Sequence, residues 1–273
     1  MIDEVVLRNL RSMSEFRHLL EIQSQSWGMS YGEATSPYIM AVECHNGGVV
    51  IGAEIGEELV GFCFGFPVKR ENQWFHWSHM TGVIPAFRGQ GIGFKLKQAQ
   101  RQWAIENGYT VMTWTFDPMQ RGNANFNFHQ LGTICNQYII NHYGEMTDRI
   151  NAGLASDRLE VIWHLSDERV LTLADNPPKS LNANDHDFKE STFLLHQNNL
   201  GEIIRTESVL DQETFYIEIP YSVNDLKHDN FVQAQHWQLE VRWALQQAFK
   251  QNFIVIDFVT SGKRSWYVLQ KHN

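Results

Sequence analysis

The sequence predicts a mixed α/β fold, because strand and helix patterns alternate over its first 165 residues. A glycine-rich turn at 89–93 stands in the middle of this alternation, between a strand pattern and a long amphipathic helix pattern. The composition agrees, since 43% hydrophobic and 19% charged residues in a chain of 273 are enough to bury a sizeable core. Length alone leaves open one large domain or two smaller ones.

The elements before the glycine turn are expected in the order strand, two helices and three strands. Ser14 is expected to cap the first helix, and Pro37 fits the first turn of the second. Gly47 and Gly48 would end that second helix. The strand patterns are 4–10, a hairpin over 49–66 and a long aromatic strand at 72–83.

The chain beyond the glycine turn is expected to continue with a helix that ends at Gly108 and a strand at 109–116. A short helix at 123–132 and strands at 133–144 and 159–165 would follow. The stretch 173–187 has two prolines, many turn-forming residues and few apolar ones, which is typical of a linker. We therefore expect a first domain over 1–168 and a C-terminal α/β extension over 169–273.

The C-terminal extension resembles the centre of the chain. Residues 96–116 and 239–259 both have a helix pattern followed by a strand pattern, and an Ile-Pro pair precedes each. One hypothesis is a degenerate half-repeat in which 215–260 corresponds to 77–116 but has lost the glycine turn. Chance similarity between two amphipathic helices is the equally weighted alternative.

Charge and cysteine content restrict the class of protein. A net charge of −9 disfavours non-specific binding to nucleic acid, which depends on Lys and Arg. Three cysteines without CxxC spacing predict neither a disulfide framework nor a metal site. The N-terminal residues lack the pattern of a signal peptide, and no run reaches the ~20 apolar residues that span a bilayer. We therefore expect a cytoplasmic protein without a metal, a nucleic-acid partner or a membrane partner.

The glycine turn has the composition of an anion site at a helix N-terminus. A Walker loop is excluded, because no Gly-Lys pair followed by Ser or Thr is present. The spacing also departs from the dinucleotide fingerprint, since Gly89, Gly91 and Gly93 run G-x-G-x-G. A tight turn at the entry to an ordinary helix remains the alternative.

Arg88 to Gly93, with Val83, Ile84 and Pro85 before them, resembles the R/Q-x-x-G-x-G/A signature of the GNAT superfamily of acyl-CoA-dependent N-acyltransferases. The similarity extends over roughly residues 4–165. It implies a mostly antiparallel central sheet with flanking helices, and acetyl-CoA as co-substrate. The residues that it implies for CoA binding are Thr81, Val83, Arg88, Gly89, Gln90, Gly91, Ile92, Gly93, Asn123 and Asn125.

Acetyl transfer to an amine needs a base for the ammonium proton and, in many enzymes, an acid for the departing thiolate. His79 matches a position at which some GNAT arylalkylamine acetyltransferases have histidine, and strict alternation would place it on the strand face of Thr81 and Val83. A packed core histidine is the alternative, and Glu54 is a second candidate base. The family commonly has a tyrosine that acts as the general acid for the thiolate, and this chain has Phe128 at the matching position. Tyr138 and His129 are candidate substitutes for that acid. The alternatives are a proton from solvent or no acid at all.

The polar stretch 141–159 would form a wall of the acceptor pocket through Asp148, Asp157 and Arg158, or else a solvated loop. The predicted function is transfer of an acetyl group to an amine of a small molecule or a peptide. A CoA-binding sensor without catalytic activity is the alternative. The C-terminal part is expected to shape the acceptor site or to form a homodimer contact.

Overall fold

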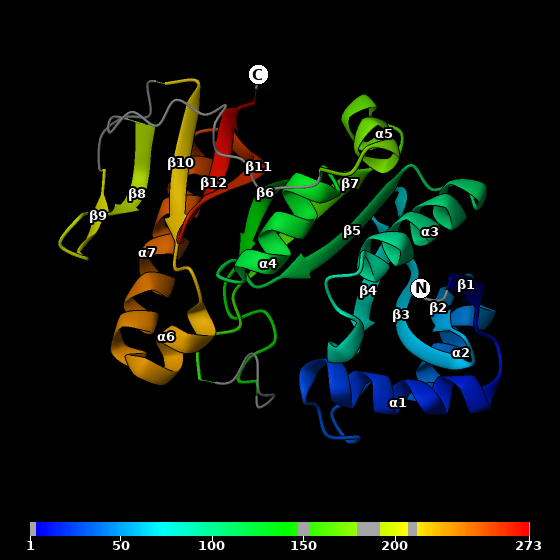
Figure 1. The fold of residues 1–273 in the computed structure, drawn as a ribbon. Helices are drawn as coiled ribbons and strands as arrows, with labels where there is room; N and C mark the ends of the chain where they lie inside the picture. Colours follow the sequence, from blue (N-terminus) through cyan, green and yellow to red (C-terminus); the bar gives the residue numbers. More distant parts are fainter. Residues whose placement is uncertain (1–3, 147–152, 179–191, 207–211, 273) are drawn as a thin grey trace. The chain divides into compact units, whose positions relative to one another are not determined.

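The computed structural model describes residues 4–146, 153–178, 192–206 and 212–272. The chain divides into two compact units (Figure 1). The first comprises 1–114, 147–152 and 164–166, and the second comprises 115–146, 153–163 and 167–273. Both combine helices with mostly antiparallel strands, which confirms the predicted fold class. The compact units do not divide at the predicted boundary after residue 168, because 115–146 and 153–163 pack with the C-terminal part.

The first unit is a sheet in the strand order β1-β2-β3-β4-β5 with helices on both faces. Neighbouring strands are antiparallel, except that β4 and β5 are parallel. The elements are β1 (Val5–Asn9), α1 (Met13–Trp27), α2 (Pro37–His45), β2 (Val49–Ile55), β3 (Glu58–Arg70), β4 (Gln73–Val83), a 3₁₀ turn (Pro85–Phe87), α3 (Ile92–Glu106) and β5 (Val111–Phe116), whose last two residues belong to the second unit.

Local capping explains where the first two helices begin. Ser12, and not the predicted Ser14, caps α1: its hydroxyl accepts from the Glu15 N–H at 3.3 Å, and the Glu15 carboxylate accepts from the Ser12 N–H at 2.8 Å. This is a capping box, which satisfies N–H groups at both positions. Pro37 is the first residue of α2, as predicted, and the Ser36 hydroxyl caps that helix.

The helices α1 and α3 cover opposite faces of the first sheet (Figure 1). Side chains of consecutive strand residues point to opposite faces, so Phe62 and Cys63 of β3 lie on opposite faces of the sheet. Phe62 packs edge to face against Trp27 of α1, with ring centroids 6.1 Å apart. The Cys63 thiol donates to the Leu96 carbonyl of α3 at 3.5 Å. The core residues Phe62, Cys63 and Leu96 are fully buried, which fixes both helices on the sheet.

The second unit has the strand order β7-β6-β11-β12-β10-β8-β9. Its pairs are antiparallel, apart from the parallel pair β8–β10. Its further elements are α4 (Arg121–Ala124), a π-helical turn (Asn125–Gln130), β6 (Ile134–Ile139), β7 (Arg158–His164), α5 (Glu168–Asp175), β8 (Phe193–Gln197), β9 (Ile203–Arg205), β10 (Thr214–Ile219), α6 (Val223–Asp229), α7 (Phe231–Lys250), β11 (Phe253–Ser261) and β12 (Arg264–Lys271).

The strand order contradicts the predicted half-repeat. In the first unit the strands that flank α3 are hydrogen-bonded neighbours, whereas β12 lies between the strands β10 and β11 that flank α7. The cause is the turn at Gly262, because it returns the chain as β12 to pair with both strands. The predicted linker at 173–187 also begins inside α5, and its residues 179–187 lie outside the described ones.

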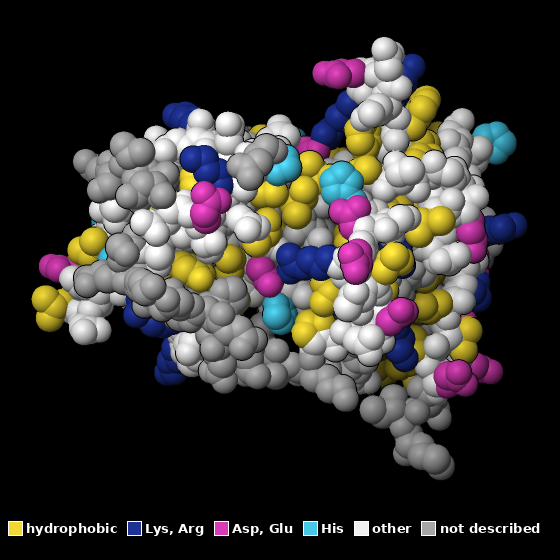
Figure 2. Space-filling model, turned by 90° about the horizontal axis from the view of Figure 1, so that it is seen from above, with side chains coloured by type: hydrophobic (Ala, Val, Ile, Leu, Met, Phe, Trp, Pro, Cys, Tyr) yellow, Lys and Arg dark blue, Asp and Glu magenta, His cyan; other side chains and the backbone are white. Residues whose placement is uncertain are grey.

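Charged side chains are interspersed on the surface seen in Figure 2, where Lys and Arg lie singly or in small groups between Asp and Glu. Within the described ranges, no helix has the length and apolarity that a bilayer span requires.

Candidate functional site

The glycine turn joins β4 to α3 in the first unit. Gly89 and Gly91 have φ angles of +77° and +76°, a left-handed conformation that favours glycine. A Cβ built at either position would meet no other described atom within 4 Å. The backbone conformation therefore favours glycine at both positions, and the space around each of them is open.

The N-terminus of α3 has donors to offer to an anion. The first bond of the helix runs from the Lys95 N–H to the Gly91 carbonyl at 3.0 Å, so the N–H groups of Ile92, Gly93 and Phe94 precede any intrahelical acceptor. Gly91 is the N-cap and has no side chain to cap them. Amides in this arrangement, together with the helix dipole, bind phosphate groups.

Arg88 fastens the turn to its surroundings. Its Nε donates to the Val83 carbonyl at 2.9 Å, and its Nη2 donates to the Ser26 carbonyl at the end of α1 at 2.6 Å. Its own N–H donates to the Pro85 carbonyl at 3.3 Å. The described contacts of Arg88 therefore hold the turn in place.

The strand β4 has an unpaired edge beyond Trp77. Its parallel pairing with β5 consists of His76 with Met112 and Trp77 with Thr113. On the other side the Ile84 N–H donates to the Val60 carbonyl of β3 at 3.0 Å. In an antiparallel pair, the backbone groups of successive residues point alternately toward and away from the partner strand. Those of Thr81 and Val83 therefore point away from β3, toward the edge of β4 that no longer pairs with β5.

His79 is the extra residue of a β-bulge. Met80 pairs with Phe64 and Ser78 pairs with Gly65, so His79 has no partner on β3. The bulge reverses the alternation, and the predicted shared face of His79 with Thr81 and Val83 is therefore wrong. Thr81 pairs with Cys63, on the α3 face, whereas His79 contacts the rings of Phe64 and Phe66, whose side chains point to the α1 face.

The environment of His79 favours the neutral imidazole. Its ring centroid lies 5.8 Å from that of Phe64 and 5.6 Å from that of Phe66. The side chain remains exposed, while the rings and the strand around it displace part of its hydration and lower its pKa below 6.5. A neutral, accessible imidazole can accept a proton near neutral pH. The other candidate base, Glu54, forms an ion pair with Arg8 at 2.6 Å.

Sequence reasoning missed a buried polar chain on the α3 face of β4. Lys97 donates to the Ser78 hydroxyl at 2.8 Å, and that hydroxyl donates to the Gln100 side chain at 2.7 Å. The Gln100 amide lies 3.2 Å from Nε2 of His76. All four side chains are buried, and burial lowers the pKa of His76 to about 3 and that of Lys97 to about 7. A usable signal was the spacing of Lys97 and Gln100, because residues three apart lie on the same face of a helix.

The predicted contacts on the short helix lie in the second unit. Asn123 is exposed on α4, and the Asn125 Oδ1 is buried without a hydrogen-bond partner among the described residues. Phe128 is fully buried between the rings of Phe116 and Tyr267. The position that commonly holds an acidic tyrosine therefore contributes to the core.

The two candidate acids of the second unit are already hydrogen-bonded to carboxylates. The Tyr138 hydroxyl donates to Asp157 at 2.6 Å, and Nδ1 of His129 lies 3.2 Å from Asp257. Burial and the Asp157 charge raise the pKa of Tyr138 well above 10, which opposes release of its proton.

The predicted pocket wall at 141–159 is only partly open to a ligand. The Asp157 side chain is buried and also forms an ion pair with Arg242, whose Nε lies 2.8 Å from it. Arg158 is buried, and its guanidinium lies 5.2 Å from the centre of the Tyr143 ring. Asp148 lies outside the described residues. Neither Asp157 nor Arg158 is a free substrate contact in this arrangement.

A further residue that the sequence did not indicate is Asp117, which directly follows β5. Burial raises the pKa of its carboxyl, while the Met119 N–H donates to it at 2.9 Å. A carboxyl group with a raised pKa is a candidate for proton transfer.

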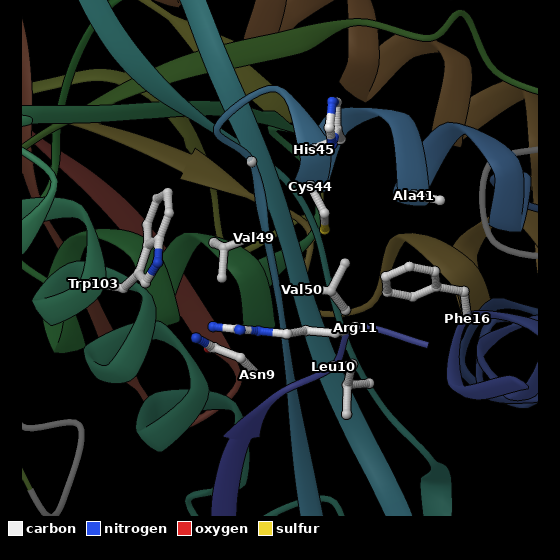
Figure 3. Close-up of a pocket in the computed structure, with 11 residues that line it drawn as sticks. Asn9, Leu10, Arg11, Phe16, Ala41, Cys44, His45, Val49, Val50 and Trp103 are labelled. Atoms are coloured by element: carbon white, nitrogen blue, oxygen red, sulfur yellow. The ribbon is translucent and has the colours of Figure 1, made fainter. Parts of the chain in front are cut away.

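A cavity of about 390 Å³ lies elsewhere in the first unit, near the end of β1 (Figure 3). Its lining includes Arg11, whose side chain extends toward Asn9 and Trp103. Trp103 lies near the C-terminal end of α3, whereas the glycine turn lies at the N-terminal end, and the residues of the turn do not line this cavity.

No group of three or more potential metal ligands occurs among the residues for which the structure gives positions. The glycine turn does fit the diphosphate of CoA, because it combines uncapped amides with open space at Gly89 and Gly91.

Comparisons with known proteins found one family model and several solved structures that are similar to this chain. Residues 16–132 match the family model of the acetyltransferase (GNAT) family. A search of curated proteins found no match. Similar solved structures include a GNAT-family chain from Desulfovibrio desulfuricans (11% identity, 60% of this chain and 100% of that chain, TM-score 0.49). Another is the ribosomal-protein-S18-alanine N-acetyltransferase from Escherichia coli (12% identity, 60% of this chain and 96% of that chain, TM-score 0.48). A third is a GNAT acetyltransferase from Elizabethkingia anophelis with acetyl-CoA bound (14% identity, 59% of this chain and 99% of that chain, TM-score 0.46).

The family match covers β4, the glycine turn and α3, which are the elements that form the candidate site. Residues 16–132 therefore form a segment that matches the acetyltransferase (GNAT) family.

Proposed function

We propose that this chain transfers an acetyl group from acetyl-CoA to an amine of a small molecule or a peptide. The observation that carries the proposal is the uncapped N-terminus of α3 beside the unpaired edge of β4, both within the first unit. Together they offer amides for a diphosphate and backbone groups for an extended arm.

The CoA contacts follow from the direction of the backbone groups. The N–H groups of Gly89 to Gly93 would hold the diphosphate, and Arg88 would hold the turn that presents them. The backbone groups of Thr81 and the N–H of Val83 would pair with the pantetheine arm, while the Val83 carbonyl accepts from Arg88. Asn123 and Asn125 stay predicted contacts for the thiol end, and the buried Oδ1 of Asn125 offers a hydrogen-bond acceptor.

Bound acetyl-CoA supplies an activated acyl group as a thioester, which an amine attacks only in its neutral form. His79 is the proposed base, because its imidazole is accessible and its lowered pKa keeps it neutral at pH 7. Its side chain would take the proton that the ammonium or the attacking amine releases. We do not propose Tyr138 as the general acid, because its hydroxyl donates to the buried carboxylate of Asp157.

A CoA-binding sensor is the second candidate function, and one observation favours it. Phe128 occupies the position of the usual tyrosine and is packed in the core, so this position supplies no proton to a thiolate. A sensor would bind CoA through the same turn and need no proton donor.

A thiol-release assay distinguishes the two functions. Acetyl-CoA is incubated with a panel of polyamines, aminoglycosides, amino acids and peptide N-termini, and free CoA is measured. Release that depends on one class of amine and falls in a His79→Gln variant supports the transferase. Binding of CoA by calorimetry without amine-dependent release supports the sensor, and the absence of CoA binding contradicts both.

A further inference from the structure

A buried lysine lies where the strands β4 and β5 stop pairing. The last residues of the parallel ladder are Trp77 and Thr113. The next residue on each strand, Ser78 on β4 and Trp114 on β5, contacts Lys97 of α3. Lys97 thus stands at the point where the unpaired edge of β4 begins.

The contacts of Lys97 join the two strands. Its ammonium donates to the Ser78 hydroxyl at 2.8 Å and lies 3.4 Å from the centre of the Trp114 ring. A cation over an aromatic face is attracted more strongly when it is desolvated, and Lys97 is only 2% exposed. The Lys97 side chain therefore holds both β4 and β5 against α3 at the end of their parallel pairing.

A lysine is an unusual choice for such a position. Lysine is almost never fully buried unless it is paired, because its ammonium loses hydration there. The lowered pKa of Lys97, about 7, reflects this cost. Filling the same volume with methionine or leucine would avoid it. A specific geometric role explains why the ammonium is present.

We propose that Lys97 is a positioning residue that sets the divergence of β4 from β5 and so presents the backbone of Thr81 and Val83 to the pantetheine arm of CoA. This inference rests on the proposed CoA binding. It separates two parts of the site: the glycine turn, which holds the diphosphate, and the β4 edge, which holds the arm. Lys97 acts on the second part alone.

The test compares two probes that share the diphosphate. One is CoA, and the other is 3′-phosphoadenosine 5′-diphosphate, which lacks the pantetheine arm. Calorimetry gives the dissociation constant of each for the wild type and for Lys97→Met. We expect the variant to bind CoA about tenfold more weakly, as when one or two backbone hydrogen bonds are lost, and to bind the nucleotide as the wild type does.

Lys95→Met is the matched control, since it makes the same side-chain change at an exposed position of the same helix. Any loss of long-range attraction in this control weakens both probes and leaves their ratio unchanged. Should Lys97→Met fail to fold, Ser78→Ala and Trp114→Leu each remove one of the two contacts, and each is expected to change the ratio in the same direction.

The outcomes separate the inference from the proposed function. A wild type that binds both probes and a Lys97→Met variant with an unchanged ratio would overturn the role of Lys97 alone. Equal weakening of both probes in Lys97→Met would also overturn it, because that result indicates a general loss of structure. A wild type that binds neither probe overturns the proposed function, and the inference with it.

Discussion

Alanine substitutions at Gly91 and Gly108 should distinguish the effect of backbone strain on stability from the effect of the glycine turn on CoA binding. Gly91 and Gly108 lie at opposite ends of α3, with φ angles of +76° and +83°. A Cβ at either position meets no other described atom within 4 Å. Alanine at either position therefore costs the same kind of free energy, about 1–2 kcal/mol for a left-handed residue with a side chain.

Binding should distinguish the two variants. At Gly91 the added methyl group projects into the space above the amides, where the diphosphate is proposed to bind, whereas Gly108 follows the C-terminal end of the helix. Loss of one or two charge-assisted hydrogen bonds, at about 1.5–3 kcal/mol each, weakens CoA binding by at least about tenfold in Gly91→Ala. Gly108→Ala should bind CoA as the wild type does.

Urea unfolding followed by tryptophan fluorescence measures the first quantity, and calorimetry with CoA measures the second. The expected pattern is an equal loss of stability in both variants and a loss of affinity in Gly91→Ala alone. If Gly91→Ala binds CoA with wild-type affinity, the turn does not hold the diphosphate. If both variants lose affinity equally, the effect comes from the stability of α3.

Three further predictions concern proton transfer and stability. For His79→Gln, kcat/KM should fall by about 10²–10⁴ and lose the decline that the wild type shows below pH 6.5; a variant that keeps this decline excludes His79 as the base. Tyr138→Phe should lose about 1–3 kcal/mol of unfolding free energy and keep kcat within a few-fold, since its hydroxyl holds Asp157; a hundredfold fall in kcat at unchanged stability would identify it as the acid. The pKa of His76 is about 3 when folded and 6.5 when unfolded, so the unfolded chain binds the extra proton between these values. Stability should therefore fall as pH drops from 6.5 toward 3, by up to about 1.4 kcal/mol per pH unit, and His76→Gln should flatten this slope in urea titrations; an unchanged slope would contradict the burial of His76.

The features that the sequence predicted correctly are local ones. The turn at Gly89 and Gly91 and the start of α2 at Pro37 depend on a few neighbouring residues. The start of α1 was also readable, because Ser12 and Glu15 have the spacing of a capping box, although Ser14 was chosen.

The features that the sequence could not supply depend on pairing between strands. The bulge at His79 arises from the pairing of β4 with Phe64 and Gly65 of β3, and no residue pattern within β4 predicts it. Strict alternation was therefore the wrong assumption beyond Ser78. In the same way, the position of β12 between β10 and β11 decides against the half-repeat, and a helix–strand pattern carries no information on strand order.

The hydrogen bonds of Arg88 have a consequence for the thermodynamics of binding. They join the glycine turn to β4 and to the end of α1 through carbonyl groups of the protein itself. A loop that is already ordered loses little conformational entropy when an anion arrives, so more of the contact energy remains as affinity. If the turn binds CoA as proposed, Arg88 would contribute to that binding without touching a phosphate. Lysine could not replace it, because a single ammonium lacks the planar fork that reaches two carbonyls at once.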